Sequence, residues 1–533
     1  MEPIFSVSFE LAGEERTLTL SSDGTAYPAD AVAELGVSLT KGSQSGIWCL
    51  MANPTVELTV RTIRAELPVD LRAIDVIYHN GYQSWTDSFE RRASWAMPGL
   101  LHVPHAVVDS HVLDGSGDYR FTPYKLIPGE QHGFTYCYLR TGERVTLVGS
   151  LNEDEGFTTV FSSWGNGSLT LDKEPPAHPL APGKECKLAA FIITTGTLDE
   201  CLESWLSHAG IKPRPARPLI GFTSWYRHYA DISAPALEHD LAGLVQVLEG
   251  CDTAGADVAF QIDDGYAKVG DWLDIDTGKF PEGLASFAAK VSEQGFIPGL
   301  WLAPFLCERG SRLFSEHPEW LLRDERFGLV ATGGNWSGAV ALDTQNPEVR
   351  AYITHTLQTV VRDWGFKLLK LDFLFAACML PHAGLNRAQL MVDGLELIRA
   401  AVGEDVALLL CGVPLAPAFG RCEYCRIGCD VGLDWDDAAY MRLLHRERVS
   451  TRLSLADTRG RAHLDGLVFG NDPDVFFLRD DVRLSTQQKD LLMNTAAASG
   501  SVLLTSDDMG AWDDFQRERY YDVLTTFLRR ERR

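Results

Sequence analysis

The sequence predicts an antiparallel β-sandwich in residues 1–215, a (β/α)8 TIM barrel in residues 216–515 and a helical tail in residues 516–533. Short alternating runs such as FSVSFEL and RVTLVGSL fill the first part, separated by Gly, Asn, Asp and Pro, which is typical of antiparallel strands. Further on, β-like runs alternate with amphipathic helical stretches, as in βα units around a parallel sheet. We count eight such strands between about residues 220 and 505, the number found in a TIM barrel.

A proline-rich segment marks the joint between the two parts. Residues 211–218 read IKPRPARP and carry three prolines, which interrupt helices and strands and so favour a linker. The chain ends in DDFQRERYYDVLTTFLRRERR, which predicts a terminal helix with a basic end. This leaves little room for a full C-terminal β-sandwich.

The composition disfavours some classes of partner. The 533 residues carry a formal net charge of −25, so nucleic acid or an anionic membrane surface would be repelled, whereas a neutral ligand would not. The N-terminus has no basic leader followed by an apolar stretch, and no run of eighteen apolar residues occurs, so we expect a cytoplasmic protein. The eleven cysteines fit reduced thiols better than a disulfide framework.

Several predicted strands stop abruptly at acidic residues. KLLKLD ends at Asp372, FQIDD at Asp264 and EYCRIGCD at Asp430. Strand interiors exclude lone charges, and the carboxyl ends of parallel strands meet at one mouth of a barrel, so these side chains should converge on one site. The candidates at such strand ends are Trp225, Asp263, Asp264, Trp301, Lys370, Asp372, Cys411, Arg426 and Asp430.

These residue types suit the binding of a sugar. Trp225 and Trp301 offer flat apolar surfaces to the C–H face of a sugar ring. The adjacent carboxylates Asp263 and Asp264 can accept hydrogen bonds from neighbouring hydroxyl groups.

Asp372 and Asp430 come from opposite sides of the predicted mouth, which suits glycoside hydrolysis by paired carboxylates. In a retaining enzyme one carboxylate attacks the anomeric carbon, and the other, about 5–5.5 Å away, protonates the leaving oxygen and then activates water. Lys370 can donate to a sugar hydroxyl and should lower the pKa of Asp372, which fits the nucleophile. Poor solvation would let Asp430 keep its proton as the general acid, although Arg426 lies near enough to oppose this.

The motifs, taken in order, resemble those of a known family. They run TSWYRHYADI, FQIDDGY followed by GDW, FPEGLASFAAKVSEQGFIPGLWLAPF, HPEWLL, LLKLDF, RIGCD and NDPDVFFL. This series resembles glycoside hydrolase family 36, the retaining α-galactosidases of the clan that also holds family 27. The resemblance covers about residues 218–508, and NGYQSW at residues 80–85 adds to it.

The resemblance implies a role for each candidate. It implies that Asp372 is the nucleophile and that Asp430, four residues after Arg426, is the acid/base. It also implies that Asp263 and Asp264 bind the 4- and 6-hydroxyls of galactose. The implied activity is hydrolysis of terminal non-reducing α-galactosides in imported oligosaccharides, and we expect no metal or organic cofactor.

The resemblance has further implications for binding and assembly. Lys370 would bind sugar hydroxyls, and Trp225 would form the aromatic floor. Residues 1–215 would form a β-supersandwich, and the protein would be a dimer or tetramer in which this domain reaches a neighbouring active site. The NGYQSW segment could be such a loop, so that Trp85 is either a contributor to substrate binding or a residue of the sandwich core.

Two departures from the family pattern leave the substituent at the 2-position of the sugar open. Where bacterial members have KWDMNR, residues 370–375 read KLDFLF, and the loop that contacts the 2-position reads CGVPLAPAFG at residues 411–420. An α-N-acetylgalactosaminidase or α-galactosaminidase that uses the same residues is therefore an alternative. A transglycosylase would also share these residues, and a non-catalytic carbohydrate-binding protein is a more remote alternative.

Two questions about individual residues also stay open. Asp434, Asp436 and Asp437 closely follow Asp430, and one of them could be the acid if the strand is misplaced. A closed zinc site needs four ligands in a tetrahedral array. Four cysteines could supply such ligands, although buried thiols are the default expectation: Cys411, Cys422, Cys425 and Cys429.

Overall fold

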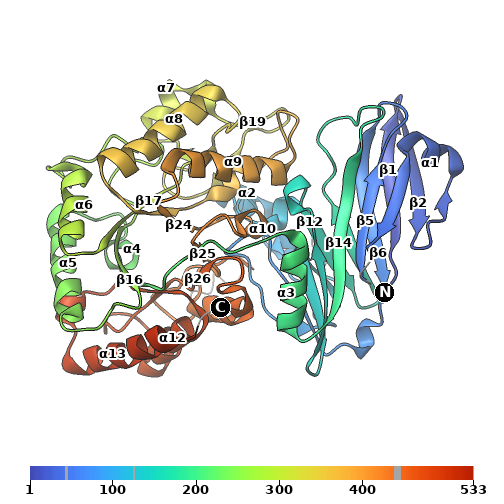
Figure 1. The fold of residues 1–533 in the computed structure, drawn as a ribbon. Helices are drawn as coiled ribbons and strands as arrows, with labels where there is room; N and C mark the ends of the chain where they lie inside the picture. Colours follow the sequence, from blue (N-terminus) through green and yellow to red (C-terminus); the bar gives the residue numbers. More distant parts are fainter. Residues whose placement is uncertain (43–45, 124–125, 437–445, 532–533) are drawn as a thin grey trace.

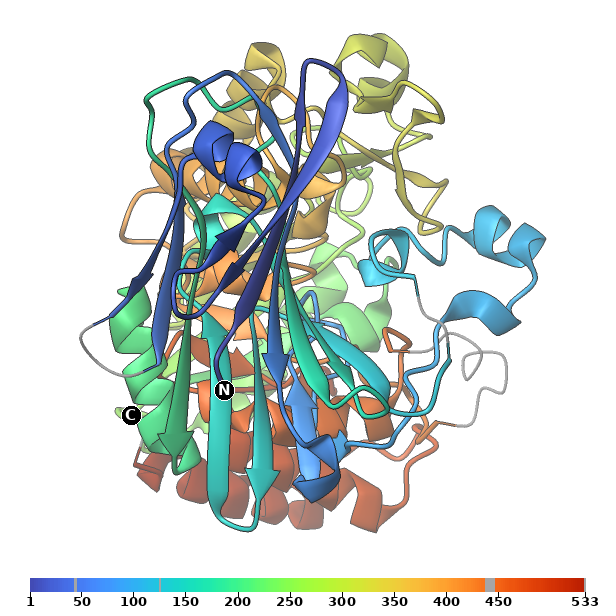
Figure 2. The same ribbon diagram turned by 90° about the vertical axis from the view of Figure 1, so that its right-hand side faces the viewer.

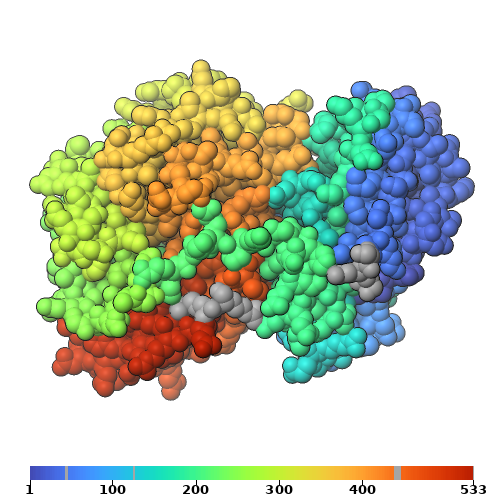
Figure 3. All heavy atoms as spheres, viewed as in Figure 1, coloured from blue at the N-terminus to red at the C-terminus, as the bar shows by residue number. Residues whose placement is uncertain are grey.

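The protein has two lobes that lie side by side. The computed structural model describes residues 1–42, 46–123, 126–436 and 446–531. In Figure 1 the N-terminal strands form the lobe on the right, together with the helices α1 (Ala29–Leu35) and α3 (Leu198–Ala209), and the parallel strands with most of the other helices form the lobe on the left. Figure 3 shows that the surfaces of the two lobes meet.

Two seven-stranded antiparallel sheets form the N-terminal lobe, in the orders β3-β2-β1-β6-β13-β12-β9 and β4-β5-β14-β11-β10-β7-β8. Side chains alternate between core and surface along the strands, and the inner faces meet around Phe5, Phe9, Trp48 and Phe191. The strands are β1 (Ile4–Leu11), β2 (Glu14–Ser21), β3 (Ala26–Tyr27), β4 (Val37–Lys41), β5 (Ile47–Ala52), β6 (Thr59–Pro68), β7 (Val76–His79), β8 (Arg91–Arg92), β9 (Glu130–Phe134), β10 (Tyr136–Thr141), β11 (Arg144–Ser150), β12 (Thr158–Ser163), β13 (Ser168–Lys173) and β14 (Cys186–Gly196).

A curled sheet of parallel strands forms the centre of the second lobe, in the order β26-β25-β24-β23-β17-β16-β15-β28-β27. The outermost strands, β26 and β27, are consecutive in the chain with only Pro473 and Asp474 between them. Two residues cannot span an open sheet, so the sheet must curl. The strands are β15 (Leu219–Thr223), β16 (Asp257–Ile262), β17 (Ile297–Leu302), β23 (Leu368–Leu371), β24 (Ala407–Leu410), β25 (Tyr424–Arg426), β26 (Gly470–Asp472), β27 (Val475–Phe476) and β28 (Val502–Thr505).

Helices cover the outer face of this sheet, which explains why its strands are apolar on both faces. All residues of β15 and β23 are buried. The α-helices of both lobes, in chain order, are α1 (Ala29–Leu35), α2 (His105–His111), α3 (Leu198–Ala209), α4 (Trp225–His228), α5 (Ala234–Leu248), α6 (Gly283–Glu293), α7 (Arg312–Glu316), α8 (Pro347–Gln358), α9 (Arg387–Val402), α10 (Leu415–Ala418), α11 (Thr451–Gly460), α12 (Thr486–Ser499) and α13 (Asp514–Arg529).

Local sequence fixes where several of these helices begin. Thr197, Asn386 and Ser485 each accept a hydrogen bond from the backbone of the third helical residue, whose side chain binds back to the cap. Such capping boxes satisfy backbone donors at the first turn.

The prediction of a multidomain fold is confirmed by the N-terminal antiparallel sheets and the curled parallel sheet. Within the described ranges, no helix is both long enough and apolar enough to cross a membrane.

Trp205 of α3 links the two lobes. Its indole is completely buried and donates from Nε1 to the carbonyl of Ser150 at 2.7 Å. The ring centroid lies 4.6 Å from that of Tyr136 in the N-terminal lobe and 6.2 Å from that of Phe419 in the second lobe. Aromatic residues on one sheet of the N-terminal lobe therefore pack into the apolar core of the second lobe, whereas the core between the two N-terminal sheets is a separate cluster. The domain boundaries at residues 215 and 515 stay predictions.

A buried cluster of charges lies at the same contact. The guanidinium of Arg446, which is 1% exposed, donates from Nε to Asp87 at 2.7 Å and from Nη1 to Asp118 at 2.8 Å. Arg91 also binds Asp87, and His132 also binds Asp118. Charges removed from water are costly unless they are paired, so these five side chains stabilise one another.

Replacing Arg446 by methionine should strongly destabilise the fold. The variant keeps Asp87 and Asp118 buried with less compensating charge, and loss of one partner from a buried pair costs about 3–5 kcal/mol. The measurement is the midpoint of thermal unfolding, followed by tryptophan fluorescence. Arg61→Met is the control, because the ion pair of Arg61 with Glu10 is exposed and such pairs are worth about 1 kcal/mol or less. Equal midpoints for the two variants would contradict this account of the contact.

Candidate active site

A cavity of about 430 Å³ lies at the carboxyl ends of the parallel strands, against the N-terminal lobe. Two of the ten predicted site residues, Cys411 and Arg426, do not line it and lie behind its wall. The other eight line the cavity together: Trp85, Trp225, Asp263, Asp264, Trp301, Lys370, Asp372 and Asp430. The structure therefore brings the predicted strand-end residues to one place, with aromatic and acidic side chains on the same surface.

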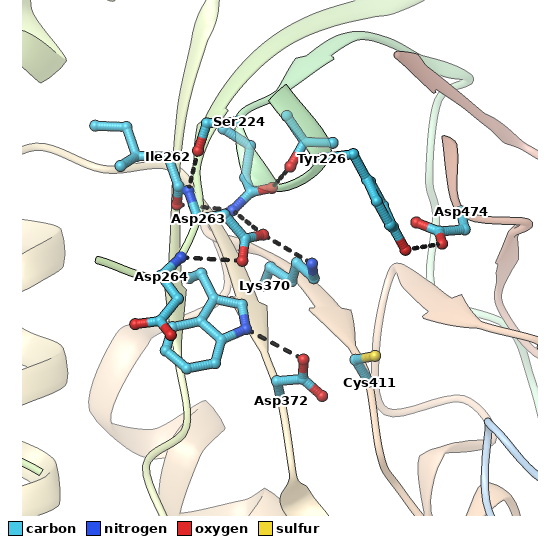
Figure 4. A network of polar contacts seen from close by, with 12 residues as sticks. Ser224, Tyr226, Ile262, Asp263, Asp264, Lys370, Asp372, Cys411 and Asp474 are labelled. Carbon is cyan, nitrogen blue, oxygen red and sulfur yellow. Dashed lines mark hydrogen bonds and ion pairs between the residues drawn. The ribbon is translucent and has the colours of Figure 1, made fainter. Parts of the chain in front are cut away.

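Asp372 is the first residue beyond β23 and lies in a dense set of hydrogen bonds. Its Oδ2 accepts from Nε1 of Trp301 at 3.1 Å, and its Oδ1 accepts from the backbone N–H of Phe373 at 2.8 Å. Phe373 has φ +53°, so the chain turns sharply at the end of the strand. The carboxyl group is thereby held with one donor on each oxygen, and Figure 4 shows the bond to the Oδ2 atom.

Lys370 lowers the pKa of Asp372, as expected, but it does not form its ion pair with that residue. The Lys370 ammonium instead binds Oδ2 of Asp263 at 2.8 Å. Burial raises the pKa of Asp372, and the positive charge of Lys370 opposes that rise only in part, while the charge of Asp430 adds to it. Asp372 and Asp430 therefore act on each other electrostatically, as two carboxylates in one cavity should.

Asp263 is the centre of a fixed polar network (Figure 4). It follows β16, and its backbone N–H donates to Oγ of Ser224 at 2.9 Å. Its side chain accepts from Lys370, from Nε2 of Gln261 at 3.2 Å and from the backbone of Asp264 at 3.0 Å. Burial opposes the charge of Lys370, but the negative charges around it, led by Asp263 and followed by Asp372, together raise its pKa. The ion pair therefore fixes both side chains in place.

Asp264 has a different environment from its neighbour. Burial raises its pKa to about 6, although a hydrogen bond from Trp336 opposes the rise. That bond runs from Nε1 of Trp336 to Oδ2 of Asp264 at 2.7 Å. The carboxylate keeps acceptor capacity on the cavity side, since each oxygen has two lone pairs.

Asp430 lies at the opposite side of the cavity and is bound by Arg426. The guanidinium donates from Nη1 to Oδ1 of Asp430 at 2.7 Å. It also binds Asp472 at 3.0 Å and Asp474 at 2.9 Å. The Asp430 side chain is 38% exposed, so the poor solvation predicted for it is not found. Arg426 is instead a buried cation whose guanidinium orients the Asp430 carboxylate.

The NGYQSW segment brings Trp85 to the cavity of its own chain. Nε1 of Trp85 donates to Sγ of Cys411 at 3.1 Å, and its ring centroid lies 5.1 Å from that of Phe373. Arg461, which is fully buried, donates to the carbonyls of Gln83 and Ser84 in the segment and to that of Ile427 beside the Arg426 strand. Trp85 therefore does not need a second subunit to reach an active site, and it does not lie in the sandwich core.

Several cavity residues were missed by the sequence analysis. Trp336 comes from the long interval between β17 and β23, which also holds the small sheet β18-β22-β21 (Leu306–Glu308, Ala339–Ala341, Ala331–Gly333). The unusual length of that interval was the available signal. Ser116, Tyr119 and Glu447 also line the cavity and come from irregular segments that no periodic pattern marks.

The alternative acids do not reach the cavity. Asp434 binds Arg483 at 2.6 Å, and Asp436 binds Arg448 at 2.8 Å. Neither of the two acids lines the cavity, and Asp437 lies outside the described residues. Asp430 therefore remains the acid that faces Asp372.

The four cysteines near β24 and β25 do not converge in the described part of the chain. Three of them donate to different backbone carbonyls: Cys422 to Ala418, Cys425 to Arg426 and Cys429 to Ser450. Among the described residues, the one group of His, Cys, Asp and Glu ligand atoms close enough for a metal is His239, Asp240 and Asp508. Arg227 binds both acids of that group, which disfavours a cation there.

Comparison with known proteins gives three consistent results. The Melibiase family model matches residues 235–383, a range that includes Asp263, Asp264, Lys370 and Asp372. The α-galactosidase AgaA of Geobacillus stearothermophilus is 29% identical over 255 residues, which cover 46% of this chain and 32% of that protein. α-Galactosidase 1 of Pediococcus pentosaceus is 41% identical over 61 residues, or 11% of this chain and 8% of that protein. The matches thus span a third or less of these relatives.

Solved structures match over nearly the whole chain. TtGalA, an α-galactosidase from Thermus thermophilus in complex with stachyose, has a TM-score of 0.71 at 26% identity and covers 97% of this chain and 99% of that chain. AgaA from Geobacillus stearothermophilus has a TM-score of 0.62 at 13% identity, over 96% of this chain and 69% of that chain, and this likeness shows the fold. Together, the family model, the sequence relatives and the structural neighbours show that this chain is similar to the glycoside hydrolase family 36 α-galactosidases and support its assignment to that family.

Proposed function

We propose that the protein is a retaining α-galactosidase that hydrolyses terminal non-reducing α-galactosides by double displacement. The observation that carries this proposal is that Asp372, after β23, and Asp430, after β25, line one cavity beside the acidic pair Asp263 and Asp264. The likeness to TtGalA, which was solved with stachyose and with p-nitrophenyl α-D-galactopyranoside, supports it.

In the first step, a carboxylate oxygen of Asp372 attacks the anomeric carbon. The bond from that carbon to the leaving oxygen breaks, and Asp430 gives its proton to that oxygen. In the second step, Asp430 takes a proton from water while the water oxygen attacks the anomeric carbon, and the Asp372 carboxylate is released. Asp430 suits this proton exchange because it is the more exposed acid, and Asp372 suits nucleophilic attack because two N–H donors fix its position.

The remaining residues would bind the galactose ring. Asp263 and Asp264 would accept hydrogen bonds from its hydroxyls, with Lys370 as a donor on the same side. Trp225 and Trp301 would give the apolar contact to the ring. Arg426 would orient Asp430, and Trp85 would cover the site from the N-terminal lobe, supported by the Cys411 sulfur.

The alternatives receive less support than the α-galactosidase. The relatives named above are all α-galactosidases, so an α-N-acetylgalactosaminidase or α-galactosaminidase is not favoured. A pure carbohydrate-binding protein would have no use for a paired nucleophile and acid. We further propose that the curled sheet is a closed (β/α)8 barrel whose seventh strand is formed by β26 and β27. The three predicted domains, a cytoplasmic location and a dimer or tetramer remain proposals.

Asp372→Asn should abolish turnover. Amide nitrogen and oxygen cannot replace the attacking carboxylate, so kcat on p-nitrophenyl α-galactopyranoside should fall by about four orders of magnitude or more, with the affinity for galactose roughly unchanged. Asp30→Asn, an exposed change in α1, is the control and should be as active as the wild type. The amino-sugar analogues of the substrate are assayed in parallel. Preference for an amino sugar would change the assigned substrate, and no turnover on any of them would favour a binding protein.

Asp430→Ala should separate substrates by their leaving group. A sugar alkoxide needs protonation and p-nitrophenolate hardly does, so kcat/KM on stachyose should fall by about 10²–10⁴-fold and that on the aryl galactoside much less. The neighbouring carboxylate Asp434 does not line the cavity, so Asp434→Ala is the matched control. Equal losses on both substrates would show that Asp430 is not the acid.

Trp336→Phe should move the pH dependence of substrate binding. The pKa of Asp264 is about 6 while Trp336 donates to it, and loss of that donor should raise the pKa further. Ionised Asp264 accepts from the sugar, so KM should increase below about pH 6 in the wild type and below a higher pH in the variant. Trp320→Phe is the control, since Trp320 donates to Glu348 away from the cavity. A profile that is unchanged or shifted to lower pH would refute the role of Asp264.

A further inference from the structure

Part of the cavity wall consists of residues that the proposed mechanism does not use. Ser116 and Tyr119 come from the N-terminal lobe, Gly333 and Asn335 from the interval before β23, and Glu447 from the segment after Asp430. Three segments that are far apart in the sequence therefore form this part of the wall, which we call the rim.

These segments are packed tightly against one another. A Cβ atom on Gly115 would lie 3.2 Å from the backbone of Thr332, and one on Gly334 would lie 3.0 Å from the carbonyl oxygen of His111. Glycine allows this close approach because it has no side chain. Figure 2 shows the α2 segment, in light blue, beside the olive-coloured hairpins of that interval. The segments of the rim therefore hold one another in place by direct contact.

Among the described residues of the rim, Glu447 is the one carboxylate, and hydrogen bonds hold it in position. Its Oε1 accepts from the hydroxyl of Thr86, and its Oε2 accepts from Oγ of Ser116 at 3.2 Å. A Cβ atom on Gly117 would lie 2.5 Å from Oε2, so the glycine leaves room for the carboxylate. Each carboxylate oxygen has a second lone pair, which leaves acceptor capacity for a ligand in the cavity.

We propose that Glu447 is the acceptor that binds a hydroxyl group of the leaving-group sugar, and that it gives the protein a preference for oligosaccharides over simple galactosides. This inference rests on the proposed function. The leaving group departs on the side of Asp430, and Glu447 lines the same cavity in the segment that follows that acid. A sugar offers several O–H donors to a carboxylate, whereas a p-nitrophenyl group offers none.

The test compares two substrates in the wild type and in Glu447→Gln. The substitution keeps the size of the side chain and removes its charge. A hydrogen bond to a charged acceptor corresponds to about a 10- to 100-fold effect, so kcat/KM on stachyose should fall by at least 10-fold more than kcat/KM on p-nitrophenyl α-galactopyranoside. Burial raises the pKa of Glu447 to about 7, so the assay is run at pH 8. Glu293→Gln, an exposed change at the end of α6, is the matched control and should change both values less than twofold.

Gly117→Ala provides a second variant that keeps the charge. Its φ of −108° accepts alanine, but the new methyl group would displace the Glu447 carboxylate. Gly117→Ala should therefore lower kcat/KM on stachyose selectively, by a smaller factor than Glu447→Gln does. The midpoint of thermal unfolding of each variant is measured to detect loss of fold.

The outcomes separate this inference from the proposed function. If the wild type cleaves neither substrate, the proposed function fails. If the wild type cleaves both substrates, two results would overturn the assignment of Glu447. One is an equal loss of activity on both substrates in Glu447→Gln, and the other is no loss of activity on either substrate. A stachyose-selective loss in both rim variants, with the control unchanged, is the expected result.

Discussion

Arg426 pairs with three carboxylates while it is almost completely buried, and the geometry of the site depends on this arrangement. A buried cation is tolerated only where opposite charges compensate for its lost hydration. Asp472 and Asp474 supply that compensation from the point where β26 gives way to β27, and Asp430 supplies it from the cavity wall. The same contacts therefore join neighbouring strands of the sheet and fix the direction of the acid.

Lys370 has the corresponding role on the other side of the cavity. Its ion pair with Asp263 leaves Asp372 to be held by N–H donors alone. The two acids in the centre thus differ in their surroundings: Asp372 is buried and fixed, whereas Asp430 is more exposed and bound on one oxygen. This difference fits the proposed roles, in which Asp372 attacks carbon and Asp430 exchanges protons with the leaving group or with water.

The strand-end pattern was sufficient to predict which acids would meet. Asp264, Asp372 and Asp430 each follow a buried strand, and the topology of a parallel sheet brings such positions together. Pair-specific properties could not be predicted in this way. Whether Lys370 binds Asp263 or Asp372 depends on side-chain directions, and the pKa of Asp372 depends on burial by residues that are remote in sequence. Trp336 and Glu447 were missed because irregular segments carry no periodic signal.

The division of the cavity between regular strands and irregular segments has a consequence for how such a protein can diversify. The proposed reacting groups lie at or just beyond strand ends, where ion pairs and hydrogen bonds hold them, whereas the rim comes from segments 111–119, 332–336 and 447–449, which lie outside the parallel strands. Insertions or substitutions in the rim can change which chain lengths are accepted without altering bond cleavage. Because one of these segments belongs to the N-terminal lobe, the two lobes must be inherited together for the specificity to persist.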